Sequence, residues 1–242
     1  MFDYLANPTR FINLSNILLP FFLIGSILLF VIGLYIALII SPDDYQQGSA
    51  VKIMYIHVPS AWLSLSSYFL MAVSCFFFLV WRHPLADLIS RSIAPIGAMF
   101  AFLTLVTGAI WGKPIWGVWW VWDARLTSML ILFLFFVGFI SLSNSFENSE
   151  RGSRPASILA IIGAINIPII KFSVDWWNTL HQPASILRSG GISIDSSMLI
   201  PLVLMSLAFH FYFILLVILN VKKLVNEKKI LHASILREYN GK

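Results

Sequence analysis

Tryptophan residues crowd into one short stretch, residues 111–128 (WGKPIWGVWWVWDARLTS), which lies between two apolar runs. Five of the nine tryptophans of the chain fall within it: Trp111, Trp116, Trp119, Trp120 and Trp122. Indole rings favour the boundary of a membrane, where the ring is sheltered and the N–H group stays hydrated. A boundary belt accounts for a few such residues, whereas this density predicts an aromatic wall for a flat ligand.

An acidic and a basic residue follow the last of these tryptophans. Asp123 is well placed to cap the helix that begins after it, because a carboxylate accepts hydrogen bonds from the free backbone N–H groups of a first helical turn. Arg125 carries a planar fork of donors that suits a carboxylate. It could pair with Asp123 or hold the acid group of a ligand.

The spacing inside the stretch predicts a short amphipathic helix. Trp116, Trp119, Trp120 and Asp123 stand at positions i, i+3, i+4 and i+7, which share one face of a helix. Pro114 fits the first turn, where its missing N–H group costs nothing. We expect this helix to lie in the outer membrane interface, either as part of a ligand site or as an anchor that binds no ligand.

Two histidines share a local pattern. His57 and His181 are each followed by one residue, a proline and two small residues, and proline restricts the backbone beyond each imidazole. Either residue alone is typical of a surface or interfacial histidine. As a pair on the side of the tryptophans, they favour two axial ligands to a haem iron. Zinc is a weaker hypothesis, because a third and fourth ligand with metal-site spacing are not evident.

The remaining histidines and the one cysteine indicate structural roles. His83 and His232 lie in polar segments, and His210 falls inside an apolar run, where we expect a contact between helices. With Cys75 as the only cysteine, the chain has no disulfide, no Cys-x-x-Cys pair and no motif for covalent haem attachment.

The composition is that of an integral membrane protein. Of the 242 residues, 59% are hydrophobic and 11% are charged, and the mean hydropathy is +0.85. A nucleic-acid partner is excluded, because almost no soluble part exists to carry a basic face. We predict an all-α fold with one polytopic domain, residues 1–242. Its six spans are residues 17–40, 61–81, 93–110, 126–142, 156–172 and 198–221, and a basic tail covers residues 222–242.

The distribution of basic residues predicts that both termini are cytoplasmic. With six spans, eleven basic residues fall on the side of the termini: Arg10, Arg82, Arg91, Arg151, Arg154, Lys222, Lys223, Lys228, Lys229, Arg237 and Lys242. Five fall on the other side: Lys52, Lys113, Arg125, Lys171 and Arg188. Because basic residues concentrate on the cytoplasmic side, the loops that hold His57, the tryptophans and His181 all belong to the outer face.

These motifs carry a resemblance to a known family. The stretch at 111–128 resembles the "WWD" signature of the haem-handling proteins of cytochrome c maturation. The segments YIHVPSAW at 55–62 and WWNTLHQP at 176–183, together with six spans, are similar to the CcmC family within that group. The resemblance covers residues from about 15 to 220 of the chain.

The resemblance implies a fold, a cargo and partners. A CcmC-like protein would be a six-helix protein of a bacterial or mitochondrial inner membrane. It would bind haem b non-covalently at its outer face and would transfer it without acting as an enzyme. His57 and His181 correspond to the axial ligands, and residues 111–128 correspond to the WWD haem-binding loop, whose five tryptophans pack against the porphyrin. Asp123 and Arg125 match the end of the motif. The implied partners are the haem chaperone CcmE, the small membrane protein CcmD and the ATP-driven transporter subunits CcmA and CcmB.

Two other classes of function stay open on the sequence alone. A membrane redox subunit that contains haem b usually places pairs of histidines inside its spans, and only His210 lies there. A haem-free small-molecule transporter needs polar residues along a path through the membrane. The spans offer few beyond Asn166 and His210.

Overall fold

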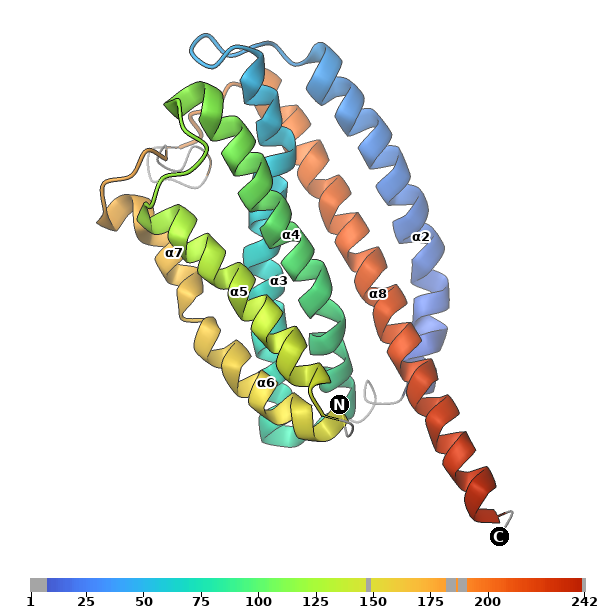
Figure 1. Cartoon of the computed structure of the whole chain (residues 1–242). Helices are drawn as coiled ribbons and strands as arrows, with labels where there is room; N and C mark the ends of the chain where they lie inside the picture. The colour runs from blue at the N-terminus through green and yellow to red at the C-terminus, as the bar shows by residue number, and fades with distance from the viewer. Residues whose placement is uncertain (1–7, 147–148, 182–185, 187–190, 241–242) are drawn as a thin grey trace.

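The computed structural model describes residues 8–146, 149–181, 186 and 191–240, and within them it forms a bundle of long helices (Figure 1). The helices are α2 (Pro8–Tyr35), η1 (Ile36–Ile40), η2 (Ser49–Ile53), α3 (Met54–Trp81), α4 (Pro84–Trp116), α5 (Ala124–Asn144), α6 (Ser149–Gly163), α7 (Asn166–Trp176) and α8 (Ser196–Asn240). Six segments are long and apolar enough to cross a membrane, so the all-α fold with six spans is confirmed for the described residues.

Most of these helices extend beyond the apolar runs that predict them. Helix α3 begins at Met54, so His57 lies within the helix and not in the loop before it. Helix α8 continues to Asn240, so most of the basic tail is helical and projects beyond the bundle (Figure 1). The predicted spans follow apolar side chains, whereas a helix continues into the polar boundary for as long as its backbone hydrogen bonds are satisfied.

The fifth span is broken in the middle. It consists of α6 and α7, which are separated by a turn at Ala164 and Ile165. Pro168 lacks the N–H group that would donate to the carbonyl oxygen of Ala164 in a continuous helix. The amide Nδ2 of Asn166 donates to the backbone oxygen of Ser128 on α5, at 2.7 Å. Asn166 and Pro168 therefore mark the break, and Asn166 links it to α5.

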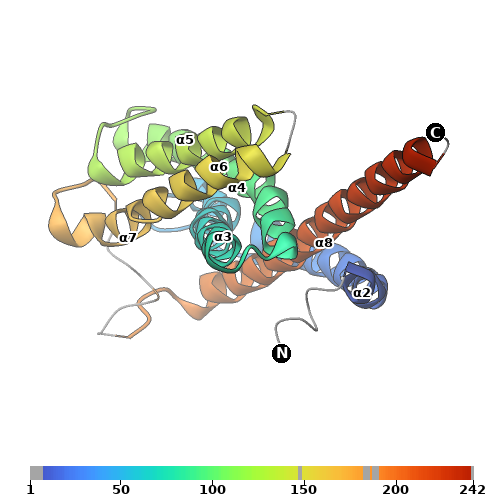
Figure 2. The same cartoon turned by 90° about the horizontal axis from the view of Figure 1, so that it is seen from below.

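The bundle has a central helix and a lateral pair. Helix α3 lies between α4, α6 and α8, and its side chains Leu63, Tyr68 and Met71 are fully buried. Helix α2 packs at the edge of the bundle against α8, as the view from below shows (Figure 2). Aromatic rings fill that seam, with Phe22 and Phe211 at a centroid distance of 5.2 Å.

Three connecting segments lie at one end of the bundle, and the start of α2 and the end of α8 lie toward the other (Figure 1). The segments are residues 41–48 between the first two spans, residues 117–123 between α4 and α5, and the described residues 177–181, 186 and 191–195 between α7 and α8. We call this end the site end. It brings together the three stretches that contain or adjoin the predicted site residues. Arg188 and Lys242 from the charge comparison, and Pro183 from the histidine pattern, lie outside the described residues.

The predicted short helix over Trp116–Asp123 is wrong. Helix α4 ends at Trp116, and residues 117–123 are not helical. Gly117 has φ of 77°, a left-handed conformation that glycine adopts without strain, and its N–H group donates to the carbonyl oxygen of Lys113. Pro114 therefore lies in the last turn of α4. The helical spacing of the tryptophans is real, but a glycine stop interrupts it.

Close packing of three helices depends on one glycine. A Cβ atom at Gly97 of α4 would lie 2.4 Å from the ring of Phe136 on α5 and 2.7 Å from the hydroxyl oxygen of Ser67 on α3. Phe136 and Ser67 are fully buried, so neither has room to move away. Small residues of this kind let membrane helices approach closely.

Replacing Gly97 with alanine is expected to destabilise the bundle. Overpacking a tight core costs about 1–3 kcal/mol of folding free energy. The change from Gly to Ala in a helix gains about 1 kcal/mol in helix propensity, so we expect the overpacking to dominate. Thermal unfolding in detergent measures the effect. The matched control is Gly138→Ala, where the new methyl group would meet only the end of the Leu159 side chain at 3.0 Å. Equal unfolding temperatures for the two variants would contradict the assignment.

Candidate functional site

The His57 imidazole is fixed by α4. Its Nδ1 atom lies 3.1 Å from the hydroxyl oxygen of Thr107. That hydroxyl has one hydrogen, and it is donated to the carbonyl oxygen of Leu103 at 2.6 Å. The hydroxyl can therefore only accept from the ring, so Nδ1 carries the hydrogen of the neutral imidazole. The lone pair of His57 is then on Nε2, the nitrogen that would bind a metal.

Two further residues of α4 complete the seat of His57. A Cβ atom at Gly108 would lie 3.1 Å from Cε1 of His57, so the ring packs directly on the helix backbone. The Trp111 ring meets the imidazole edge-on, with centroids 5.6 Å apart and an interplanar angle of 73°. Trp111 follows Gly108 by three residues and Thr107 by four, so it shares a face of α4 with each of them.

The first connecting segment reaches the site through Gln47. The Asp44 carboxylate accepts from the backbone N–H group of Gln47 at 2.8 Å and so forms a tight turn. The side-chain oxygen of Gln47 then accepts from the indole Nε1 of Trp111 at 3.0 Å. Trp111 is thus held on both sides, by Gln47 at its polar edge and by His57 at its ring.

The His181 imidazole is fixed by Asp123. Its Nδ1 atom lies 3.0 Å from Oδ2 of Asp123, and Thr179 donates a short hydrogen bond to the same oxygen. The backbone N–H group of His181 donates to the Thr179 hydroxyl oxygen at 3.2 Å. An ionised carboxylate only accepts, so Nδ1 of His181 carries the hydrogen and its lone pair is on Nε2.

Asp123 also caps α5. Its Oδ1 atom accepts from the backbone N–H group of Leu126 at 2.8 Å, and Asp123 itself has an extended backbone. The predicted cap is confirmed. The same side chain uses its second oxygen for His181, so the start of α5 and the orientation of the imidazole depend on one carboxylate.

The charges of this pair follow from its surroundings. Burial raises the pKa of Asp123, but hydrogen bonds from Thr179, from the backbone N–H group of Leu126 and from His181 outweigh it and lower the pKa below its ordinary value. Burial lowers the pKa of His181, and the Asp123 carboxylate only partly opposes that effect. At neutral pH the pair is therefore a carboxylate and a neutral imidazole, which is the form of histidine that binds metals.

The end of α4 links the two imidazoles. Trp116 packs edge-on against His181, with centroids 4.9 Å apart, and its ring lies over the backbone of Gly112. Trp111, slightly more than one turn earlier, contacts His57. The two histidines also lie within electrostatic range of each other. Residues far apart in the chain are thus brought to one place by a single helix end.

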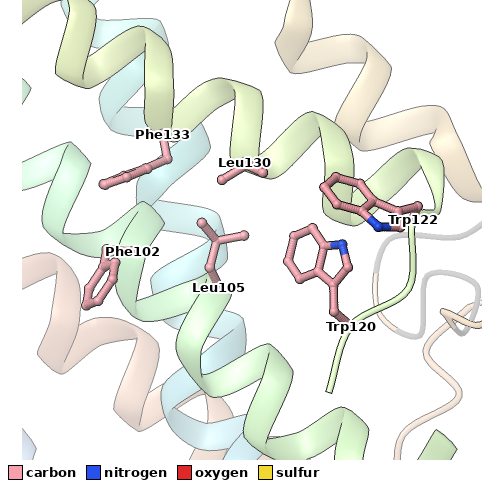
Figure 3. A pocket seen from close by; sticks show the side chains of 6 residues that line it. All are labelled: Phe102, Leu105, Trp120, Trp122, Leu130 and Phe133. Atoms are coloured by element: carbon pink, nitrogen blue, oxygen red, sulfur yellow. The ribbon is translucent and has the colours of Figure 1, made fainter. Parts of the chain in front are cut away.

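The other three tryptophans lie on the segment after α4. Trp120 and Trp122 meet edge to face at 76°, so these two rings do not form one flat wall. They line one end of an apolar groove between α4 and α5, at the right of the view in Figure 3. The rest of its lining is Phe102, Leu105, Leu130 and Phe133. The Trp120 N–H group is buried without an acceptor in the described part of the chain. Trp119 is exposed, with the Lys113 ammonium 5.9 Å from its ring.

Arg125 faces the broken fifth span. Its Nε atom donates to the hydroxyl oxygen of Ser173 at 3.3 Å, and a terminal nitrogen donates to the carbonyl oxygen of Lys171 at 3.4 Å. The close ion-pair contact of Asp123 is with His181. The Arg125 guanidinium is attracted to the Asp123 carboxylate from a longer distance. It adds positive charge to the site end next to His57 and His181.

Two other histidines form local hydrogen bonds. Nδ1 of His83 accepts from the backbone N–H group of Ala86 at the start of α4, at 3.3 Å. The His210 ring bonds through Nδ1 to the carbonyl oxygen of Ser206 in its own helix, at 2.7 Å. The side chain of His232 lies outside the described part.

Sequence reasoning missed the residues that fix the imidazoles. Thr107 and Gln47 are not part of any recognised pattern, and Thr179 lies within the segment 176–183 but is assigned no role there. A local signal exists only for Thr179, which stands two residues before His181, within reach of a turn formed by a side-chain hydroxyl. Thr107 contacts His57 across 50 residues of sequence, and only the packing of α3 on α4 shows the contact.

Comparison with known proteins decides the family. The sequence profile of the CcmC family, described as "Heme exporter protein C", matches residues 1–235. A protein of that name from Bradyrhizobium diazoefficiens is 55% identical over 212 residues, which cover 88% of this chain and 80% of the relative. The chain belongs to the CcmC family. Relatives of the same name from Escherichia coli and Haemophilus influenzae are both 46% identical, over 82% and 84% of this chain and 80% and 83% of their own lengths.

The chain is therefore a multi-pass membrane protein of the CcmC family.

The surroundings of His181 predict how its imidazole titrates. Because burial dominates, we expect the pKa of His181 to lie below its usual value of 6.5. The ring then stays neutral through neutral pH and gains its proton only as the pH falls below that of an ordinary histidine. Nitrogen NMR of histidine-labelled protein in detergent measures this titration.

The Asp123→Asn variant tests the cause. The carboxylate raises the pKa of His181 against the effect of burial, so its removal should lower that pKa further. Asparagine remains a good helix cap, which keeps the start of α5 intact. A His181 pKa above 6.5 in the wild type, or one that rises in the variant, would contradict this account.

Proposed function

We propose that this protein holds haem at the site end and transfers it to the haem chaperone CcmE during the maturation of c-type cytochromes. The two axial ligands of the iron are Nε2 of His57 and Nε2 of His181. The relatives are named heme exporter proteins, which supports haem as the cargo. The proposal makes the protein a haem-binding and transfer subunit.

One observation carries the proposal. Two neutral imidazoles at the same end of the bundle each have Nδ1 engaged by a second residue, Thr107 for His57 and Asp123 for His181. Histidines that bind metals are typically oriented in this way, with the remote nitrogen bonded to a carboxylate, a carbonyl or another acceptor. The arrangement aims two Nε2 lone pairs, and a bis-histidine iron needs two such ligands.

The tryptophans and Arg125 suit the remainder of a haem. Trp111 and Trp116 pack beside the imidazoles, and Trp120 and Trp122 present apolar surface over the groove between α4 and α5. A porphyrin is apolar over most of its area and carries two carboxylates at one edge. Arg125 supplies positive charge at the site end for those carboxylates. The binding is non-covalent, as expected for haem b, because the chain has no cysteine at the site.

Membership of the family supports a setting for the reaction. We place the protein in the inner membrane with the site end on the outer face, which the distribution of basic residues supports. The small protein CcmD and the transporter subunits CcmA and CcmB are its partners in this proposal. This chain has no nucleotide-binding motif, so ATP hydrolysis belongs to a partner.

Loss of either histidine should change the spin state of the bound iron. The purified wild type should show a six-coordinate, low-spin haem spectrum, both oxidised and after reduction with dithionite. His57→Ala and His181→Ala should each shift the spectrum toward high spin. The double variant should retain at least about tenfold less haem than the wild type, because removing even an outer partner of a metal ligand lowers the affinity by about 10–100-fold.

His210→Ala is the matched control, since His210 bonds within its own helix. It should keep the low-spin spectrum of the wild type. The proposal fails if the double variant retains full loading with a low-spin spectrum. It also fails if the wild type, expressed with its partners and supplied with haem, binds none.

A further inference from the structure

We propose that the two axial bonds are unequal: the bond from the iron to His57 opens first, and His181 keeps its hold until transfer. Thr107 and Asp123 are the positioning residues that set this order. The inference rests on the proposed function, because it concerns the two ligands named there. It goes further, since it assigns each ligand a distinct part in the release of haem.

The side of His181 has the stronger ligand. Its Nδ1–H group donates to a carboxylate that is 5% exposed, at 3.0 Å. A hydrogen bond to an ionised acceptor is about twice as strong as one between neutral groups. It draws the Nδ1 hydrogen toward Asp123 and leaves more electron density on Nε2, which raises the basicity of the ligand. Ferric iron is therefore bound more tightly on this side.

The side of His57 has the weaker ligand. Its Nδ1–H group donates to the hydroxyl of Thr107, a neutral acceptor, at 3.1 Å. This contact fixes the direction of the ring but adds no negative charge to it. The Arg125 guanidinium acts on both imidazoles and draws electron density away from them. At His181 the Asp123 carboxylate opposes this effect, whereas no carboxylate among the described residues does so at His57. His57 is thus equally well aimed and less basic.

The positions of the two residues in the fold support the same order. His57 lies within α3, and its ring packs on the backbone of α4 at Gly108, so it cannot follow a departing ligand. His181 lies in the connecting segment between α7 and α8, outside any helix. Helix interiors are held more firmly than connecting segments. A haem that moves outward would therefore break its bond to His57 first.

Carbon monoxide bound to the reduced, haem-loaded protein tests the order directly. It takes the coordination position whose bond opens more easily, so an Fe–C bond replaces the Fe–N bond to His57 and the iron stays ferrous. The C–O stretching frequency then reports on the ligand opposite, which is His181. Asp123→Asn should shift this frequency, because the opposite ligand loses its charged partner. Thr107→Val should leave it at the wild-type value.

The rate of binding gives a second and independent readout. Thr107→Val removes the side-chain hydrogen-bond partner of His57 on α4 and leaves the backbone hydrogen bond at Thr104 in place. Carbon monoxide should therefore bind about tenfold faster, by the lower end of the range for such outer partners. Thr104→Val is the matched control. Thr104 is a buried threonine of the same helix, and its hydroxyl donates to the carbonyl oxygen of Phe100 at 2.8 Å. The control should leave both the rate and the frequency unchanged.

The histidine variants keep the test decisive if Asp123→Asn folds poorly. The carbon monoxide complex of His57→Ala should have the frequency of the wild type, since its opposite ligand is still His181. The complex of His181→Ala should differ. The inference is overturned if these two results are exchanged. It is also overturned if Thr107→Val shifts the frequency while Asp123→Asn does not, or if both shift it equally.

Failure of this inference is distinguishable from failure of the proposed function. If the histidine variants keep a low-spin spectrum before any carbon monoxide is added, the proposed ligands themselves are wrong. If that spectrum is lost as expected and the order of opening is reversed, the ligands stand and only the inequality between them fails.

Discussion

The site end depends on the carboxylate of Asp123, which makes two different attachments. One oxygen caps the first turn of α5, and the other accepts from His181 and Thr179. Removal of the carboxylate would leave a backbone N–H group at the start of a membrane helix without its partner and would free the imidazole to rotate. Because one side chain serves both purposes, the position of α5 and the aim of His181 are coupled. Asp123 of the WWD motif therefore both stabilises the start of α5 and orients the His181 imidazole.

Helix α4 is the second constraint, because it provides a wall for both imidazoles. Thr107 and Trp111 contact His57, and Trp116 contacts His181. Gly97, deeper in the same helix, lets α4 approach α3 and α5 closely enough for these contacts to form. Gly117 then ends the helix and turns the chain toward Asp123. Gly97 thus sets how closely α4 packs on its neighbours, and Gly117 sets where α4 ends.

Packing at the site end also separates two kinds of tryptophan. Trp111 and Trp116 belong to α4 and contact histidines, whereas Trp120 and Trp122 follow the glycine stop and line the apolar groove between α4 and α5. Helical spacing in the sequence suggested a single row. The left-handed backbone at Gly117 breaks that row, and the direction of each indole then depends on the segment that carries it.

The sequence by itself determined the class of fold and the family. The backbone N–H and C=O groups of a long apolar run must be hydrogen-bonded in lipid, and a helix forms these bonds within its own segment. The WWD stretch is specific enough to identify the relatives. It also indicated Asp123 as a cap, because capping is a local interaction. Only the tertiary structure decided that His57 lies inside α3 with Thr107 as its partner, and that His181 donates to Asp123 across 58 residues. Such contacts depend on which faces of separate helices meet, and that is fixed by packing over the whole bundle and not by the neighbours of a residue in the chain.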